Sequence, residues 1–248
     1  MTFVKPSLTS YVAKSRGIVF FTGAGLSTES GIPDFRSPGG LWSRMKPIQF
    51  QDFLASDAVR QESWKRRFSG ENTIKLALPN IGHKVIARLL NSGKASCVIT
   101  QNIDNLHQES GIENCESRVI ELHGNATYAK CLSCDKRYEM EQLANQFHKI
   151  GRVSECDSCG GIVKSATVSF GQSMPEYEMQ CAQQATLACD LFIVVGSSLV
   201  VYPAAGFPEL AHRNGATLVI VNREPTPMDD IADLVVHEEI GACLSSLM

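Results

Sequence analysis

The sequence lacks any apolar run approaching the roughly 20 residues that a membrane-spanning helix needs. Residues 1–17 also lack the uninterrupted apolar segment of a secretory signal. We therefore expect a cytoplasmic protein with no membrane partner. An excess of basic charge is missing too, because 23 Lys and Arg stand against 26 Asp and Glu, for a net charge of -3. Phosphate binding needs a basic field, so we expect no direct nucleic-acid binding.

Internal repeats and low-complexity stretches are also absent, which argues against solenoids and disordered tracts. Hydrophobic residues make up 44% of the chain and charged residues 20%, which is ordinary usage for a globular protein. The 248 residues fit one large domain, or one domain with a small insert.

Short apolar runs alternate with helix-like segments along the chain. The runs at residues 17–22, 96–100, 191–195 and 217–221 are typical of buried parallel strands. Residues 81–90 carry a helical apolar face and are followed by Gly93, and residues 203–214 predict a helix that begins at Pro203 and ends before Gly215. This alternation predicts an α/β fold with a Rossmann-like, doubly wound parallel sheet.

Two stretches interrupt the alternation and read as insertions in a single domain that spans residues 1–248. Residues 37–80 look helical and rich in loops, whereas residues 126–164 contain paired cysteines. Right-handed crossovers leave the carboxyl ends of the strands at one edge of a sheet. We therefore expect both insertions to project over the edge where such sheets bind ligands.

Four of the nine cysteines form two CxxC pairs, Cys131 with Cys134 and Cys156 with Cys159. This spacing lets both thiolates of each pair reach one tetrahedral zinc ion, and four thiolates leave no position for water or substrate. We therefore predict one structural Zn²⁺, with His148 unnecessary as a ligand. One alternative to a zinc site is four buried cysteines that bind no metal. Another is a redox-active CxxC pair, which is disfavoured because neither pair lies at a strand-to-helix junction.

A glycine-rich loop, Thr22 to Arg36, follows the first expected strand. Its glycines would let backbone N–H groups approach a pyrophosphate at the start of a helix. The usual dinucleotide pattern, however, has a third glycine where Thr28 stands, and no acidic residue ends an obvious second strand. An ordinary hydride-transfer enzyme therefore fits poorly.

Polar groups follow two further strands at the same expected edge. Residues 101–107 form a dense hydrogen-bonding set after the strand at 96–100, and an apolar run at 119–122 delivers His123. A polar helix cap would explain Asn102 or Asp104 equally well. A lone histidine is more often structural, but its titration range makes His123 the natural general base.

The ordered motifs TGAGLSTESGIPDFR, TQNIDNLH, ELHG, the paired CxxC, SFGQSMP, VGSSLVVYP and IVNRE span nearly the whole chain. Together they closely resemble the sirtuins, of the bacterial type. The resemblance implies an enzyme that removes acyl groups, most often acetyl, from lysine side chains while it cleaves NAD. Its products are nicotinamide and O-acyl-ADP-ribose, and its partners are acylated-lysine peptides or proteins.

The resemblance also assigns residues. His123 matches the base that deprotonates a ribose hydroxyl, whereas His107 reads as structural. Asn102 and Asp104 match the ribose and nicotinamide pocket and count as catalytic. Cofactor contacts are expected at Gly23, Ala24, Gly25, Ser27, Asp34, Phe35, Arg36, Gln101, Asn102, Ile103, Asp104, Gly196, Ser197, Ser198, Asn222, Arg223, Glu224 and Glu239. The peptide is expected between Phe170-Gly171 and Leu199-Val200, as an added strand.

Two departures from the family pattern bear on the substrate. Gln172 stands where many members have Glu, which removes a negative charge near the peptide cleft. Trp64 and Arg67 have the spacing of a Tyr and an Arg that select succinyl-like groups in some members. An indole lacks the phenolic hydroxyl and suits an apolar wall. We therefore expect removal of acetyl or longer apolar groups over removal of succinyl groups.

Two other functions stay open at this point. An ADP-ribosyltransferase or NAD glycohydrolase would use the same pocket, although a retained His123 suits deacylation better. A non-catalytic module that senses NAD or binds acyl-lysine is the second, and the full set of glycine, polar and histidine positions argues against it.

Overall fold

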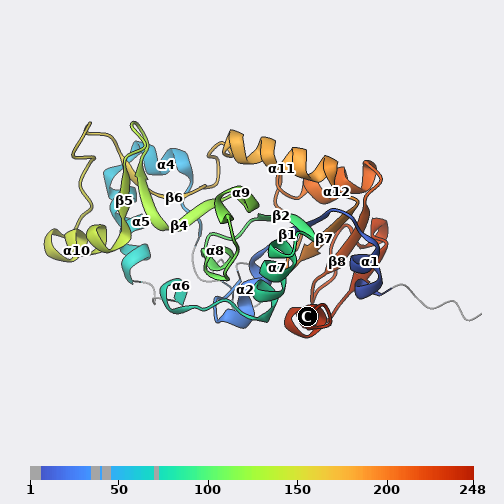
Figure 1. The fold of residues 1–248 in the computed structure, drawn as a ribbon. Helices are drawn as coiled ribbons and strands as arrows, with labels where there is room; N and C mark the ends of the chain where they lie inside the picture. The colour runs from blue at the N-terminus through green and yellow to red at the C-terminus, as the bar shows by residue number, and fades with distance from the viewer. Residues whose placement is uncertain (1–6, 35–39, 41–45, 70–72) are drawn as a thin grey trace, which may run out of the picture.

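The computed structural model of this chain describes residues 7–34, 40, 46–69 and 73–248 (Figure 1). Its larger part is a six-stranded sheet in the order β3-β2-β1-β7-β8-β9, in which every neighbouring pair is parallel. The strands are β1 (Ile18–Thr22), β2 (Ala95–Thr100), β3 (Val119–Glu121), β7 (Leu191–Val195), β8 (Thr217–Val221) and β9 (Leu234–Val236). The expected doubly wound α/β fold is confirmed.

The central strands are mostly apolar because helices cover both faces of the sheet. In β1, Ile18 and Phe20 belong to the core on one face, and Val19 and Phe21 belong to the core on the other. All four side chains are fully buried. A strand buried on both sides needs no polar alternation, which is why the sequence shows continuous apolar runs here.

Helices α1 (Leu8–Lys14), α7 (Ile81–Asn91) and α13 (Ile240–Ser245) pack on one face, while α11 (Glu176–Ala188) and α12 (Gly206–Arg213) pack on the other (Figure 1). The Asn80 side chain caps α7 by accepting from the backbone of Gly82 and His83. Within the described ranges, no helix combines the length and the apolar character that a membrane crossing requires.

The remaining helical segments are short or lie in the insertions. They are α2 (Ala24–Ser27), η1 (Thr28–Ser30), α4 (Phe50–Ala55), α5 (Asp57–Ser69), α6 (Thr73–Leu76), α8 (Leu106–Glu109), α9 (Cys115–Arg118), α10 (Met140–Ile150) and η2 (Asp229–Ile231).

One expected helix boundary is wrong. The helix expected from Pro203 begins instead at Gly206, after a turn in which the Gly206 amide bonds to the Pro203 carbonyl. Pro208 explains the later start, because a proline inside a helix would remove a hydrogen bond, whereas a first-turn amide has no partner in the helix. Starting at Gly206 puts Pro208 in that first turn.

A smaller lobe stands at one end of the molecule (Figure 1). Its antiparallel sheet has the order β5-β4-β6, formed by β4 (Gly124–Cys131), β5 (Arg137–Glu139) and β6 (Val163–Thr167). Trp64 from α5 shares a buried core with Ala129, Cys131 and Leu143 of this lobe. The helical and the cysteine-rich stretches therefore pack on each other.

The order in which the chain adds strands to the main sheet reverses between the two central strands, β1 and β7. From β1 the chain continues to β2 and β3 on one side, and β7, β8 and β9 follow on the other side. In sheets of this kind the crevice for a ligand opens at such a switch point, outside the carboxyl ends of the strands. The fold therefore points to the loops after β1 and β7.

Candidate active site

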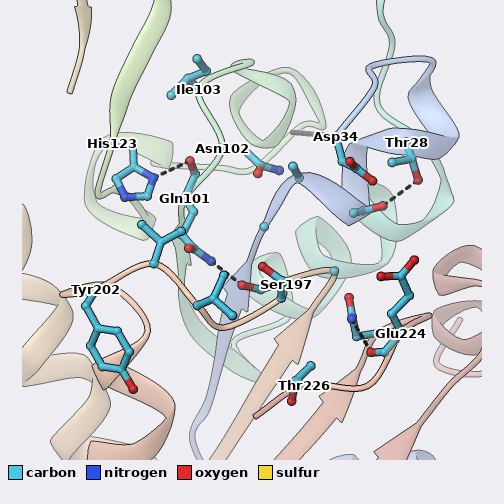
Figure 2. A pocket seen from close by; sticks show the side chains of 18 of the residues that line it. Thr28, Asp34, Gln101, Asn102, Ile103, His123, Ser197, Tyr202, Glu224 and Thr226 are labelled. Carbon is cyan, nitrogen blue, oxygen red and sulfur yellow. Dashed lines mark hydrogen bonds between the residues drawn. The ribbon is translucent and has the colours of Figure 1, made fainter. Parts of the chain in front are cut away.

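A cavity of about 810 Å³ opens at this switch point. It is lined by the loops that follow β1, β2, β7 and β8, by His123 after β3, and by Thr167 at the end of β6 with residues 168–172 and 174 after it. Figure 2 shows polar side chains from these separate loops turned toward a common space. The size is in the range of cofactor and small-molecule sites.

Two loops meet backbone to backbone at the floor of the cavity. The Gly25 amide donates to the Gly196 carbonyl at 2.8 Å, and the Gly23 amide donates to the Val195 carbonyl at 3.0 Å. A Cβ on Gly196, whose φ is 66°, would lie 2.3 Å from the Leu26 nitrogen. Only glycine fits there. Gly23 and Gly25 therefore also let the loop after β1 pack directly against the turn after β7.

Gln101 joins the ends of two strands across the cavity. Its backbone amide donates to the Thr22 carbonyl at 2.9 Å, and its side-chain amide donates to Ser197 Oγ at 2.7 Å (Figure 2). Side-chain as well as backbone hydrogen bonds therefore link the loops at the switch point.

Ser27 lies between Asn102 and Asp104. The Ser27 hydroxyl donates to Asp104 Oδ2 at 2.6 Å and accepts from Asn102 Nδ2 at 3.1 Å. Burial raises the pKa of Asp104, and its hydrogen bonds from Ser27 and from the Leu106 amide oppose that rise. Asn102 lines the cavity, whereas Ser27 and Asp104 do not and support it from behind.

His123 has a defined tautomer. Its Nδ1 lies 3.0 Å from the carbonyl oxygen of Gln101, which can only accept a hydrogen bond (Figure 2). Nδ1 must therefore carry the proton, so that the lone pair of the neutral ring is on Nε2. His123 lines the cavity. A histidine oriented in this way is suited to general-base catalysis.

The loop after β8 forms the other end of the cavity. Asn222 Nδ2 donates to the Glu224 carbonyl at 2.6 Å, and its own carbonyl accepts from His237 Nδ1 at 2.8 Å. Arg223 and Glu239 form an ion pair at 2.8 Å. These contacts shape the loop, and the sequence did not indicate the ion pair.

The apolar side of the cavity has partly exposed walls. Phe170, Val200 and Tyr202 line it with 40%, 48% and 65% of their surface exposed. Leu199 does not line it, because it is 2% exposed and packs in the sheet core with a left-handed φ of 54°. Gln172 accepts from the Ser169 amide at 3.1 Å, a contact that requires no negative charge.

The structure places two expected substrate residues elsewhere. Trp64 is 3% exposed and stacks on Phe68 at 5.5 Å in the small lobe. Arg67 donates to the Ala126 carbonyl at 2.7 Å. Neither side chain is among the described residues that line the cavity. The expected contacts of Phe35 and Arg36 lie outside the described residues.

Most other expected positions do come together at the cavity. These are Gly23, Ala24, Gly25, Asp34, Gln101, Asn102, Ile103, His123, Phe170, Gly171, Gly196, Ser197, Ser198, Val200, Asn222, Arg223, Glu224 and Glu239. Sequence reasoning missed Thr28, Glu29, Val168, Tyr202, Thr226 and Glu238, which also line it. Several of them lie within a few positions of an expected site residue in the sequence, and this proximity could have indicated them.

The four paired cysteines form one cluster in the small lobe. Their Sγ atoms all lie within 4.8 Å of one another, with Cys131 to Cys159 at 3.5 Å and Cys134 to Cys156 at 3.6 Å. Tetrahedral zinc with bonds of 2.3 Å would hold its sulfur ligands about 3.8 Å apart. The cluster therefore fits Zn²⁺, and His148 is not part of it.

Comparison with known proteins agrees with this geometry. Residues 23–203 match the Sir2 family. The chain is 54% identical to an NAD-dependent protein deacetylase of Rhodopseudomonas palustris over 97% of both chains. It is 56% identical to NAD-dependent protein deacetylase 1 of Bradyrhizobium diazoefficiens, over 96% of this chain and 92% of that one. A solved Sir2 structure with a p53 peptide and NAD+ shares 37% identity and a TM-score of 0.84, over 96% of this chain and 94% of that chain.

Proposed function

This chain belongs to the Sir2 family and is an NAD-dependent protein deacetylase, and on that premise we propose which of its residues carry each step. The tautomer of His123 supports this proposal more than any other single observation. A histidine whose Nδ1–H donates to a backbone carbonyl presents Nε2 as the base, and His123 does so in the lining of a cavity of about 810 Å³, which is in the size range of cofactor sites.

In the proposed reaction the acyl oxygen of the lysine substrate bonds to the anomeric carbon of the nicotinamide ribose, and nicotinamide leaves. His123 Nε2 then removes a proton from a ribose hydroxyl, which attacks the carbon of the activated acyl group. The protonated His123 returns this proton to the lysine nitrogen, which leaves as the free amine. Water then adds to the acyl carbon, and the bond from that carbon to the anomeric oxygen breaks, so that the acyl ester stays on the ribose hydroxyl and the anomeric carbon keeps a hydroxyl group. General-base catalysis of this kind contributes roughly 10²- to 10⁴-fold to a rate.

The nicotinamide end of NAD is assigned to the part of the cavity lined by Asn102 and Ile103. The Asn102 amide can orient the ribose hydroxyls or the carboxamide, and Ser27 and Asp104 hold that amide in place. Ile103 supplies an apolar wall that limits access of water to a reactive intermediate. Asn102 therefore acts on the substrate directly, and Asp104 acts through Ser27.

The adenosine end is assigned to the loops after β7 and β8. Ser197, Ser198 and Asn222 offer hydrogen-bonding groups there, and the ion pair of Arg223 with Glu239 borders them. Backbone groups around Gly23 to Gly25 lie between the two ends, where the pyrophosphate would pass.

The acylated-lysine peptide is assigned to the partly exposed apolar side of the cavity, against Phe170, Gly171 and Val200. Arg223 is the only Lys or Arg that lines the cavity in the described part of the chain, and it belongs to the adenosine end. Arg67 is held by the Ala126 carbonyl outside the lining. Among the described residues, no Lys or Arg at the peptide side of the cavity can pair with an acyl carboxylate. This supports a preference for acetyl and longer apolar acyl groups over succinyl groups.

The Zn²⁺ site has a structural role. A four-thiolate site has no open position for a substrate, so the ion would hold the two cysteine loops of the small lobe together. Lys136 bridges these loops by an ion pair with Asp157 at 2.7 Å. Four reduced thiols fit the expected cytoplasmic location, which stays a prediction.

A rate comparison tests the substrate assignment. Acetyl-, butyryl- and succinyl-lysine versions of one peptide are incubated with NAD, and nicotinamide release is followed with and without each peptide. We expect release that depends on the acetyl or butyryl peptide. A clear succinyl preference would contradict the acyl assignment. Release that is independent of any peptide would favour glycohydrolysis, and labelled ADP-ribose on protein would favour ADP-ribosyl transfer.

A further inference from the structure

A chain of buried hydrogen bonds runs from helix α8 to the backbone of Asn102, on the side away from the cavity. His107 Nε2 lies 2.9 Å from Thr22 Oγ1, Thr22 Oγ1 donates to Thr100 Oγ1 at 2.8 Å, and Thr100 Oγ1 accepts from the Asn102 amide at 3.0 Å. His107, Thr22 and Thr100 are each at most 2% exposed. None of the three lines the cavity.

The order of donors follows from the chemistry of these groups. Because the Thr22 hydroxyl gives its single proton to Thr100, it can only accept from His107, whose Nε2 therefore carries the proton. Burial and the neighbouring His83 hold the pKa of His107 well below its ordinary value, so the ring stays neutral. With a neutral ring and its proton on Nε2, His107 donates to Thr22, and each hydrogen bond of the series then has one donor and one acceptor.

This chain acts at the point where the regular sheet ends. Thr22 and Thr100 are the last residues of β1 and β2 and are paired in register. The Gln101 amide still bonds to the Thr22 carbonyl, but Asn102 lies beyond the ladder, and its amide takes the Thr100 hydroxyl instead. The hydrogen bonds of these side chains therefore fix the backbone one residue beyond the ladder, at Asn102, whose side-chain amide lines the cavity.

The choice of a histidine at position 107 supports this role. His83 and His107 face each other with ring centroids 5.1 Å apart, and in this pair only His107 Nε2 has a hydrogen-bond partner. Burying an imidazole whose other nitrogen has no partner is unfavourable, so an apolar residue would serve packing better. Compared with an apolar residue, the imidazole of His107 adds the hydrogen bond to Thr22.

We propose that His107, Thr22 and Thr100 are positioning residues that set the place of Asn102 in the NAD cavity and thereby the rate of the chemical step. The proposal rests on the proposed function of Asn102. Misplacement of a catalytic group by about 1 Å can reduce a rate on the order of 100-fold. A smaller displacement, which leaves NAD bound, would lower kcat while the KM for the peptide stays the same.

Substitution of Thr22 by Val tests the proposal, because it replaces one hydroxyl by a methyl group. We expect kcat to fall by about tenfold or more at an unchanged peptide KM, and Thr22→Ser, which keeps the hydroxyl, to restore most of it. The pH profile of kcat should keep its shape, since His123 is untouched.

Thr186 offers a matched control. It is fully buried in α11, its hydroxyl donates to the Ala182 carbonyl at 2.7 Å, and it does not line the cavity. Thr186→Val should lower the melting temperature but keep kcat within about twofold. Equal kcat losses in Thr22→Val and Thr186→Val, or full kcat in Thr22→Val, would overturn the proposal.

A second pair covers the case in which Thr22→Val does not fold. His107→Gln keeps an N–H donor near Thr22, whereas His107→Met removes it, and we expect higher kcat in the Gln variant. Equal kcat in the two variants would contradict the proposal. Absence of NAD-dependent deacetylation in the unaltered protein would instead refute the proposed function itself.

Discussion

Acid should destabilise this protein through a histidine that takes no part in catalysis. His83 in α7 is fully buried, neither of its ring nitrogens has a hydrogen-bond partner, and burial lowers its pKa to about 4. In the unfolded chain a histidine titrates near 6.5. Between these two values the unfolded state binds a proton that the folded state does not bind, so the free energy of unfolding falls as the pH falls.

The size of the effect follows from the difference between the two pKa values. One group contributes up to about 1.4 kcal/mol per pH unit, and therefore at most roughly 3 kcal/mol between pH 6.5 and 4. His107 acts in the same direction, because its pKa is also lowered by burial. A loss of this size is a large part of the stability of a typical domain.

The assay is urea unfolding followed by circular dichroism at a series of pH values from 7.5 to 4.5. His83→Leu, which is of similar size and cannot be protonated, should be at least as stable as the unaltered protein at pH 7.5, because it removes unpartnered nitrogens. It should also lose less stability toward pH 4.5. Acid release of zinc affects both proteins, so the difference between them isolates His83. Parallel curves for the two proteins would show that His83 does not contribute to the loss of stability in acid.

Three further predictions concern the site and the metal. His123→Ala should lower kcat for deacetylation by roughly 10²- to 10⁴-fold with NAD affinity kept in calorimetry, and a loss below tenfold would exclude it as the base. Cys131→Ser should remove zinc from the purified protein, seen by metal analysis, and lower the melting temperature; full stability without zinc would contradict the structural site. Gly196→Ala should abolish NAD binding and lower stability, because its Cβ would lie 2.3 Å from the Leu26 nitrogen, and wild-type affinity would contradict the packing of the two loops.

The sequence predicted well wherever a local pattern has only one structural outcome. The strands at 191–195 and 217–221 have the expected bounds, because apolar residues on both faces mark a strand between two helical layers. The cysteine pairs behave in the same way, since the CxxC spacing already brings two thiolates together.

Contacts between distant residues were beyond such patterns. The helix of Trp64 and Arg67 was expected, but spacing alone could not tell that this face of α5 packs on the small lobe instead of the cavity. Likewise, Thr22 and His107 are 85 positions apart, and only the parallel pairing of β1 with β2 brings the hydroxyl of Thr22 toward α8. These features are set by the tertiary fold.

Mass spectrometry of an acetyl-lysine peptide, incubated with the purified protein with and without NAD, tests whether this protein couples deacetylation to NAD cleavage. We expect that the peptide loses its acetyl group only with NAD, and that each deacetylated lysine yields one nicotinamide and one O-acetyl-ADP-ribose. Free acetate formed without NAD, or NAD cleavage with the acetyl group still on the peptide, would contradict it.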